Sequence, residues 1–391
     1  MSPESSRVPP EDGRLAGRLS PDGGRLPGRL RILPRALANR FVRLQRRQPP
    51  PAPRRILVAH HLLLGDTLML TPLLAKLRER HPQARIVMTV RRAFAPLYAA
   101  RPYGVEAIVL EPQDAGTLDA LFALGSPDLA YVPGDNRYSW LAAAAGARWI
   151  VAHAGDRPAY KSWPADELRP YPDAPASWAD MVAMLAEGPA PRPYRPEDWP
   201  APRCTPFDRP GGEYCVLHVG AGSKLRLWKR DRWLAVAAEL ERKGLQVVWS
   251  AGRGEEGEVA GIDPGRRFSS YAGALDLAQL WNLIRGAGLL LCPDTGIAHL
   301  GRLAGTPTVT LYGPGSPVLF GPGDFWRETP DRAITVDPFP CRDQRTLFKR
   351  EIAWVRRCQR TLEECPAPRC MHAIGVEEVV QAALDSARHA V

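Results

Sequence analysis

Long apolar runs are absent from this 391-residue sequence, and no stretch approaches the roughly 18 apolar residues that cross a bilayer as a helix. The first residues, MSPESSRVPPEDGRLAGRL, also lack the apolar segment and the small-residue cleavage site of a secretory signal peptide. We therefore expect a cytoplasmic protein rather than a secreted or membrane-spanning one.

Cysteine is scarce, and the odd number, seven, argues against a disulfide framework. Four of the cysteines crowd into residues 341–370, separated by 16, 6 and 4 residues: Cys341, Cys358, Cys365 and Cys370. This is not the paired C-x2-C spacing of a common zinc site. Four thiolates can nevertheless close a tetrahedral structural site for zinc or iron, and the alternative is a set of unpaired thiols near the surface.

Lysine is missing from residues 1–50, which hold eleven arginines against four acidic residues. Seven of the ten net positive charges of the chain therefore lie in this segment, and the remainder is nearly neutral. Such a basic end favours contact with an anionic partner, a phospholipid surface or nucleic acid.

Residues 1–53 are rich in Pro, Gly and Arg and repeat Gly-Arg-Leu four times, a composition that predicts a disordered extension. Within it, Leu33, Leu37, Phe41 and Leu44 recur at helical spacing among five arginines. This pattern over Leu33–Arg47 is typical of a helix lying on an anionic membrane, so peripheral contact with the inner face of a bacterial inner membrane is one interpretation. The alternatives are a solvated linker or a translation start placed too far upstream.

The rest of the chain alternates strand-length and helix-length segments in two blocks, separated by a Pro-rich linker at 191–212. We predict an α/β fold of two Rossmann-like domains, residues 54–190 and 213–391, that face each other across a ligand-binding cleft. The predicted strands are 55–59, 86–90, 107–110, 129–132, 149–152, 215–219, 246–250, 289–292 and 308–312. The predicted helices are 66–80, 229–243, 275–287 and 295–304.

In the second block, a buried strand ends at Pro293-Asp294 and a helix starts at Thr295-Gly296. The free amides of Thr295, Gly296 and Ile297 at this helix N-terminus predict an anion site, and Gly296 would admit a phosphate close to the backbone. The alternative is that Asp294 simply caps the helix.

A glycine-rich turn, His218 to Ser223, follows the first strand of the same block and leads to Lys224, Arg226 and Arg230. Amides and cations that converge after a strand suit a diphosphate leaving group, because its charge grows as the bond to a sugar breaks. The alternative is an ordinary glycine loop followed by solvated cations.

Gly65-Asp66 lies where the loop after the first strand of the first block meets the following helix. Asp66 is placed as a helix N-cap or, alternatively, as the base that takes a proton from an acceptor hydroxyl. A helix N-terminus lowers a carboxyl pKa, so the second role requires that the cleft desolvate Asp66.

At these residues the chain resembles glycosyltransferase family 9, the bacterial heptosyltransferases that build the inner core of lipopolysaccharide. The resemblance is carried by residues 56–86, 216–240, 277–314 and 370–384. It implies a GT-B fold, an acceptor site in the N-terminal domain, a nucleotide-sugar site in the C-terminal domain, and inverting transfer that requires no cofactor. It also implies ADP-heptose as donor, a lipid A core acceptor and no nucleic-acid partner.

The resemblance also implies roles for individual residues of this sequence. Asp66 falls on the catalytic base of the family. The donor-phosphate segment of the family covers Thr295, Gly296 and His299, with Asp294 beside it and Gly220, Arg226 and Lys224 facing it. Glu255 or Glu256 lies near the acidic contact to the nucleotide ribose, and the acceptor side includes His60, His61 and Gly65.

Two departures bear on specificity: His60 to Leu64 replaces the usual cation and hydroxyl residues before Gly-Asp, and Arg226 precedes Leu227-Trp228 where the family often has Lys. Relatives that glycosylate autotransporter proteins are similar in holding iron with clustered cysteines. The sequence thus predicts a heptosyltransferase acting on lipopolysaccharide, with a protein acceptor or a non-catalytic nucleotide-sugar binding protein as alternatives.

Overall fold

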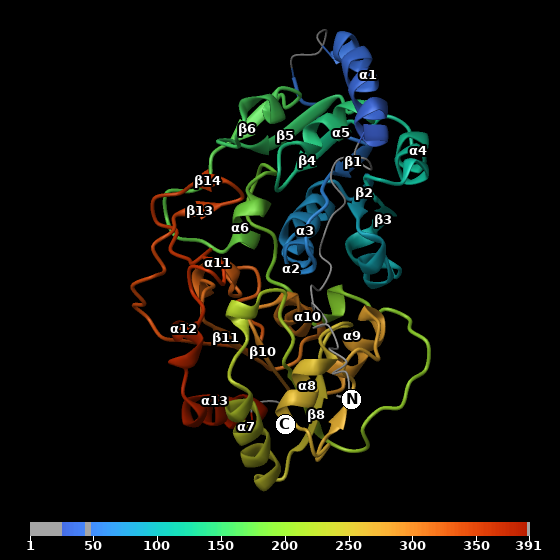
Figure 1. The fold of residues 1–391 in the computed structure, drawn as a ribbon. Coiled ribbons are helices and arrows are strands. Elements are labelled where there is room, and N and C mark those ends of the chain that lie inside the picture. The colour runs from blue at the N-terminus through green and yellow to red at the C-terminus, as the bar shows by residue number, and fades with distance from the viewer. Residues whose placement is uncertain (1–25, 44–47, 389–391) are drawn as a thin grey trace, which may run out of the picture.

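Two six-stranded parallel sheets organise the protein, one in each of two α/β domains (Figure 1). The computed structural model describes residues 26–43 and 48–388. The strand orders are β3-β2-β1-β4-β5-β6 and β12-β11-β10-β7-β8-β9. Both sheets thus share the doubly wound order in which ligands bind at the carboxyl ends of the central strands. The architecture is the predicted one.

The N-terminal sheet is built from short apolar strands, such as β4, whose four residues are all buried. Such runs are expected when helices cover both faces of a parallel sheet. Its strands are β1 (Arg55–Val58), β2 (Arg85–Val90), β3 (Val105–Val109), β4 (Leu129–Val132), β5 (Trp149–His153) and β6 (Glu167–Arg169). Its helices are α2 (Leu64–Leu68), α3 (Thr71–Arg80), α4 (Ala115–Ala123), α5 (Tyr138–Ala144) and α6 (Trp178–Ala183), with 3-10 turns at Arg92–Tyr98, Pro102–Gly104 and Ala159–Ser162.

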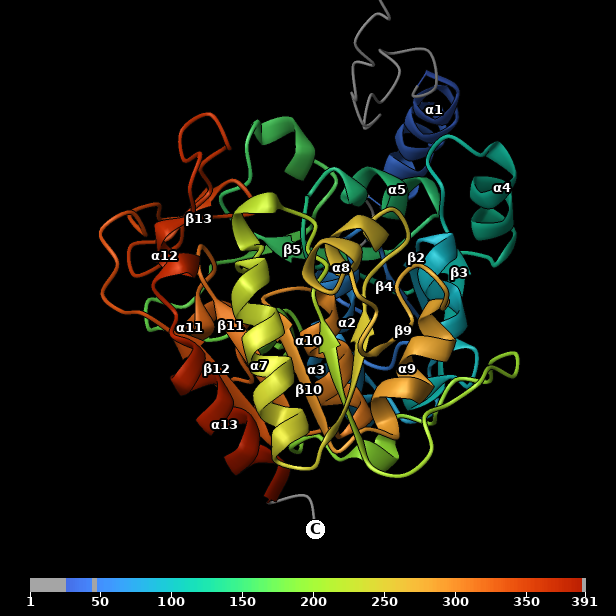
Figure 2. The ribbon, with the colours of Figure 1, turned by 60° about the horizontal axis from the view of Figure 1, so that its bottom comes forward.

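The C-terminal sheet is covered on one face by α7 and α13, which lie in front of its strands in Figure 2, and on the other face by α9 and α10. The strands are β7 (Tyr214–His218), β8 (Gln246–Ser250), β9 (Ser269–Ser270), β10 (Leu289–Pro293), β11 (Thr308–Tyr312) and β12 (Asp331–Thr335). The helices are α7 (Arg230–Arg242), α8 (Glu256–Ile262), α9 (Leu277–Arg285), α10 (Gly296–Ala304), α11 (Pro317–Phe320), α12 (Arg369–His372) and α13 (Val376–Arg388). A small hairpin joins β13 (Thr346–Leu347) and β14 (Arg350–Glu351), and 3-10 turns cover Pro196–Asp198 and Lys224–Arg226.

The helix predicted over residues 66–80 is divided into α2 and α3. Pro72 stands in the first turn of α3, where its missing N–H costs nothing, and the chain turns at Met69-Leu70 just before it. The break lets α2 tilt its N-terminus toward the second domain, so it matters for the site described below.

Helix α1 (Leu26–Arg43) overturns the predicted disorder over its range, and it overlaps the segment Leu33–Arg47 for which a helix was one interpretation. It packs on α5, where Ala36 is buried and Asn39 donates to the carbonyls of Ala143 and Ala144 at 3.0 and 3.2 Å. This contact supplies the packing that the Gly/Arg composition did not suggest. Residues 44–47 of the predicted amphipathic segment, like residues 1–25, lie outside the described part.

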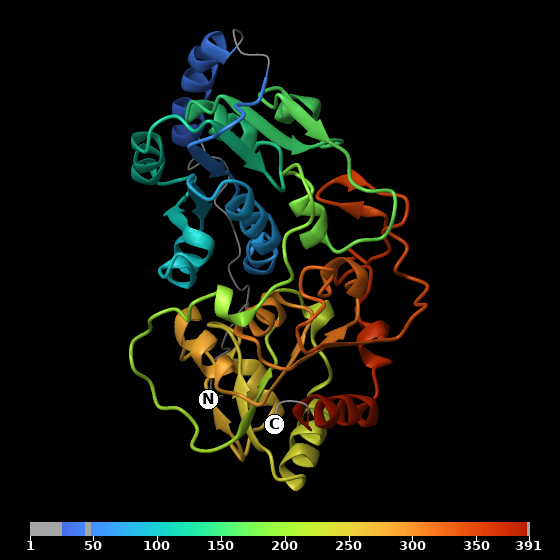
Figure 3. The same ribbon diagram turned by 180° about the vertical axis from the view of Figure 1, so that it is seen from behind.

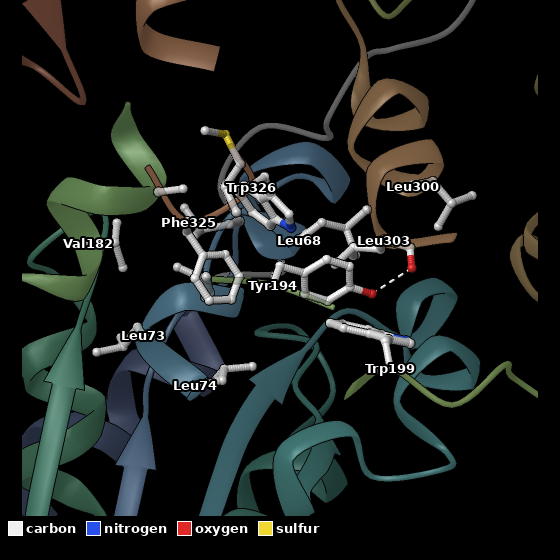
Figure 4. Close-up of a cluster of buried hydrophobic side chains, with 14 of the residues drawn as sticks. Leu68, Leu73, Leu74, Val182, Tyr194, Trp199, Leu300, Leu303, Phe325 and Trp326 are labelled. Atoms are coloured by element: carbon white, nitrogen blue, oxygen red, sulfur yellow. Dashed lines mark hydrogen bonds between the residues drawn. The ribbon is translucent and has the colours of Figure 1, made fainter. Parts of the chain in front are cut away.

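The linker between the domains is packed rather than loose. Figure 4 shows Tyr194 among the leucines and aromatic rings of both domains, where it donates to the carbonyl oxygen of Leu303 in α10 at 2.6 Å. Trp199 stacks on Trp281 of α9 with ring centroids 5.8 Å apart. These contacts bury apolar surface from both domains in one continuous core.

Candidate active site

A cavity of about 1040 Å³ lies between the two domains, at the carboxyl ends of β1, β7 and β10. This volume is at the upper end of what small-molecule sites occupy. The sequence-predicted residues that line it are Gly65, Asp66, Gly220, Arg226, Glu255, Asp294, Thr295, Gly296 and His299. Acceptor-side and donor-side candidates from opposite halves of the chain therefore share one space.

Asp66 lies within the first turn of α2 rather than at its N-cap, which is Leu63. The N-cap interpretation is therefore wrong. Burial raises the pKa of Asp66 to about 6, against the lowering effect of Arg357 and Arg226. The cavity thus supplies the desolvation that a catalytic carboxylate needs at this helix end, and the pKa lies near neutrality, where a general base is most effective.

The N-terminus of α10 is capped by Thr295, whose Oγ1 accepts a hydrogen bond from the amide of Ile297 at 3.3 Å. The alternative that Asp294 caps the helix is therefore wrong. The amide of Ile297, which was predicted to be free, is already hydrogen-bonded. The carboxylate of Asp294 is buried, its Oδ2 has no hydrogen-bond partner among the described residues, and burial raises its pKa. Its main-chain carbonyl accepts from Nη1 of Arg226 at 2.7 Å, which fixes that guanidinium beside the helix end.

Gly65 and Gly296 bring α2 and α10 into contact across the domain boundary. A Cβ atom on Gly296 would lie 2.9 Å from the amide nitrogen of Gly65 and 3.0 Å from Cγ of Leu64. A Cβ on Gly65 would lie 3.1 Å from the ring of His299. A Cβ at Gly296 would therefore clash with the facing backbone and one at Gly65 would be crowded, a reason for glycine that differs from the phosphate approach predicted for Gly296.

His299 is buried and held by Arg302, whose Nη1 lies 2.8 Å from Nδ1 of the imidazole. A guanidinium has only donors, so Nδ1 must accept and the ring proton must be on Nε2, beside Gly65. Burial and the charge of Arg302 hold the pKa of His299 well below its usual value. His299 is thus a neutral N–H donor at the cavity wall.

The residues predicted around the glycine-rich turn differ in whether they line the cavity. Gly220 lines the cavity, and a Cβ there would lie 1.9 Å from Oε2 of Glu255, which itself accepts from the amide of Gly252 at 2.9 Å. Of the two predicted glutamates, Glu255 is therefore the one that lines the cavity, where Asp276 is a further acidic residue. Glu256 instead accepts from the amide of Gly254 at 3.0 Å, and neither it nor Lys224 is among the lining residues.

His60 and His61 are not among the lining residues, unlike Gly65. His60 is buried behind the loop, where its Nδ1 accepts from the amide of Leu62 at 3.2 Å, and burial lowers its pKa to about 3. His61 lies 3.5 Å from the carboxylate of Glu111, and burial lowers its pKa too. Both histidines therefore lie behind the cavity wall and pack within the loop that carries Asp66.

The four C-terminal cysteines share one neighbourhood. Burial raises the pKa of Cys341, with smaller contributions from Cys358 and Cys365, and Cys370 is affected by burial and by Cys341 in the same way. Among the described residues, however, no group of three or more His, Cys, Asp or Glu side chains is arranged as ligands of one ion.

Many lining residues were not predicted, and five of them come from the segment between β12 and α12. Its contributions are Leu347, Phe348, Lys349, Arg357 and Gln359. No motif or periodicity marks them in the sequence, because they reach the cavity only through tertiary folding.

Residues 186–330 match the family model described as glycosyltransferase family 9 (heptosyltransferase). Lipopolysaccharide heptosyltransferase 1 of Pseudomonas aeruginosa is 29% identical over 113 residues, which are 29% of this chain and 32% of that protein. The chain spans about a third of the length of the curated relatives that it matches first.

Solved structures match over much more of the chain. The E. coli ADP-heptose lipopolysaccharide heptosyltransferase II has a TM-score of 0.65 at 18% identity, covering 86% of this chain and 99% of that one. An iron-containing dodecameric glycosyltransferase of enterotoxigenic E. coli has a TM-score of 0.54 at 15% identity, covering 87% and 77%. Likeness at this identity concerns the fold. It shows that this chain has the two-domain GT-B fold of these heptosyltransferases, and residues 186–330 are similar to glycosyltransferase family 9.

Proposed function

We propose that this protein is an inverting glycosyltransferase that transfers heptose from ADP-heptose to a lipopolysaccharide core acceptor in the cytoplasm. The observation that carries the proposal is the shared cavity, in which Asp66 of one domain faces the N-terminus of α10 and Arg226 of the other. A proton acceptor and an anion site on opposite walls are what displacement at an anomeric carbon requires.

In the proposed reaction, the carboxylate of Asp66 takes the proton from an acceptor hydroxyl. The hydroxyl oxygen forms a bond to the anomeric carbon, and the bond from that carbon to the phosphate oxygen breaks. The electron pair stays on the diphosphate, beside Arg226 and the N–H of His299. Attack from the face opposite the leaving group inverts the anomeric configuration, and holding both reactants in one cavity supplies orientation.

The donor side takes the nucleotide. Glu255 is placed by Gly252 near the end of β8, where a carboxylate can accept hydrogen bonds from ribose hydroxyls. ADP-heptose is favoured because structures similar in fold are described as binding ADP or an ADP-heptose. The lipopolysaccharide acceptor is favoured by the names of the curated relatives.

A donor and acceptor screen by mass spectrometry tests the proposal. Purified protein is incubated with ADP-heptose or UDP-glucose and with either a lipid A core precursor or a polypeptide, and the Asp66→Ala variant serves as the control. Release of ADP that depends on the lipid is the expected result. Transfer to the polypeptide would replace the acceptor, and nucleotide-sugar binding without turnover would point to a non-catalytic binding protein.

We also propose that Cys341, Cys358, Cys365 and Cys370 hold one structural zinc or iron ion. Four thiolates are a suitable ligand set for either metal, and the neighbour described as iron-containing shares the fold. The ion would tie the ends of the segment between β12 and α12 together and take no part in the transfer step.

A peripheral membrane contact through α1 completes the proposal. Leu30, Leu33 and Leu37 form an exposed stripe opposite the side packed on α5, and the basic charge of this end suits an anionic lipid surface. The part of the chain that the structure describes contains no helix long and apolar enough to span a bilayer.

A further inference from the structure

The segment at residues 337–368, here called the strap, leaves β12, reaches the N-terminal domain and returns to α12. Figures 1 and 3 show it in orange and red along one side of the molecule, with the β13-β14 hairpin beside the N-terminal domain. Arg350, only 2% exposed, anchors the hairpin. Its guanidinium donates to the carbonyls of Ala154 and Gly134 at 2.8 and 3.0 Å and to Oδ1 of Asn136 at 2.7 Å.

The strap continues from this anchor along the cavity. Trp354 donates to the carbonyl of Pro172 at 2.9 Å, whereas the amide of Cys358 donates to the carbonyl of Pro314 in the C-terminal domain at 2.9 Å. Arg357 lies between these two attachments, and its main chain pairs with Gln344 through two hydrogen bonds of 3.1 Å. The backbone of Arg357 is therefore fixed between the two domains.

The side chain of Arg357 lines the cavity together with Asp66, Asp294 and Arg226. Its guanidinium carbon lies 5.3 Å from the centre of the Phe320 ring, which orients the group. Its Nε is buried and has no hydrogen-bond partner among the described residues. A buried donor of this kind is costly unless a ligand satisfies it.

The charges of the cavity indicate which ligand that is. Burial and the nearby Arg226 both lower the pKa of Arg357, yet a guanidinium remains charged in proteins. The two carboxylates that face the arginines, Asp66 and Asp294, are themselves pushed toward neutrality by burial, and His299 is neutral. The other charged lining residues are Arg253, Lys349, Glu255 and Asp276. Within the group around Asp66 and Asp294, Arg226 and Arg357 thus converge with less than two full opposing charges, which favours a multiply charged anion between them.

We propose that Arg357 is a second leaving-group cation, which binds the sugar-linked phosphate of the donor jointly with Arg226. The proposal rests on the proposed function, since it assigns a residue to the diphosphate of the same donor. As the bond from the anomeric carbon to the phosphate oxygen breaks, the electron pair stays on that oxygen. Both guanidinium groups stabilise the resulting negative charge. Arg350 attaches the strap to the N-terminal domain. Arg357 is therefore in place to bind the phosphate only when the strap contacts both domains.

Nucleotide titration calorimetry on the full-length protein tests the proposal, with ADP and AMP as probes. Arg357→Gln is expected to weaken ADP binding about 10- to 100-fold, the usual size of a lost hydrogen bond to a charged group, and to change AMP binding by less than about 2-fold. Arg357→Lys, which keeps the charge, should recover part of the loss. Arg356→Gln is the matched control, because Arg356 is exposed and, within residues 26–43 and 48–388, bonds only to the carbonyls of Ala353 and Val355.

A second readout separates this role from a merely structural one. Arg357 lowers the pKa of Asp66, so the acidic limb of kcat/KM should move to higher pH in Arg357→Gln. Unchanged ADP binding in Arg357→Gln, or equal losses for ADP and AMP, would overturn the proposal and leave the proposed function standing. Failure of the wild-type protein to bind ADP would instead remove the proposed donor, and this inference with it. If Arg357→Gln does not fold, the ADP and AMP affinities of Arg357→Lys decide.

Discussion

Arg302 donates a hydrogen bond to Nδ1 of His299 at 2.8 Å and so fixes the proton of the imidazole on Nε2. The same guanidinium forms an ion pair with Asp331 at 2.6 Å, in which both side chains are almost fully buried. A residue that touches no ligand therefore decides which atom of His299 faces the cavity.

Removal of this N–H donor should slow the transfer step. His299→Ala is expected to lower kcat by about 100-fold, the usual cost of losing one donor to a developing negative charge. His299→Gln, whose amide can present an N–H in a similar place, should retain more activity than His299→Ala. Steady-state kinetics with ADP-heptose measures both, and a kcat of His299→Ala within about 2-fold of wild type would contradict the assignment.

Activity should depend on the ionisation of Asp66. Its pKa is raised to about 6, so the carboxylate form that accepts a proton is lost as the pH falls through about 6. The kcat/KM profile of the wild-type protein should show this acidic limb.

Asp66→Asn should lower kcat by about 100-fold or more, because general-base catalysis contributes on that scale. ADP affinity should stay constant or increase in this variant, since a negative charge leaves the cavity. A variant with normal transfer and unchanged nucleotide binding would show that Asp66 is not the base.

The ion pair between Arg302 and Asp331 should matter for stability. Asp331→Asn leaves a buried guanidinium without its counterion and is expected to cost about 3–5 kcal/mol. Glu258→Gln is the control, because its partner Arg230 is exposed and the solvent-screened pair should be worth less than about 1 kcal/mol. Urea unfolding followed by tryptophan fluorescence gives both values, and equal midpoint shifts would contradict the expectation.

The cysteine proposal predicts about one equivalent of zinc or iron in protein purified without chelator. The site should survive dialysis, because structural sites of this type bind with about 10 kcal/mol or more. Cys365→Ser should lower the metal content, whereas Cys204→Ser, outside the cluster, should not. Elemental analysis decides, and less than a tenth of an equivalent in the wild-type protein would refute the site.

The α1 proposal predicts binding to vesicles of phosphatidylethanolamine and phosphatidylglycerol. Replacing both Leu33 and Leu37 by Glu should weaken binding by at least about 10-fold, because apolar burial and charge attraction are both reduced. Leu362→Glu is the control, a comparably exposed leucine on the strap. Vesicle flotation measures binding, and equal flotation of the variants at low salt would exclude α1 as the contact.

The sequence predicted the buried parts of the fold well. The strands at 129–132, 246–250 and 308–312 have the predicted bounds, because a continuous apolar run between turn residues allows few alternatives. The edge strands β6, β9 and β12 were not predicted, since they are short, partly exposed and polar, and only their neighbours in the sheet make them strands.

The site was predictable where local backbone chemistry creates it. The turn into α10 and the loop before α2 carry their own signals, although the capping residue was wrong in both, because Asp66 and Asp294 look like caps only when their burial is unknown. The second half of α1 showed a helical pattern, but its packing on α5 and the role of Arg357 gave no such signal. Their roles depend on α5 and on the strap anchor, which are distant in the sequence.

The contact of Gly65 with Gly296 has a consequence for motion. The first turns of α2 and α10 touch backbone to backbone, so the two domains cannot slide past each other at this point. A domain rotation that keeps this contact would pivot about it. The distance from Asp66 to the N-terminus of α10 then changes least of all, while walls farther from this pivot swing to admit the nucleotide and release it.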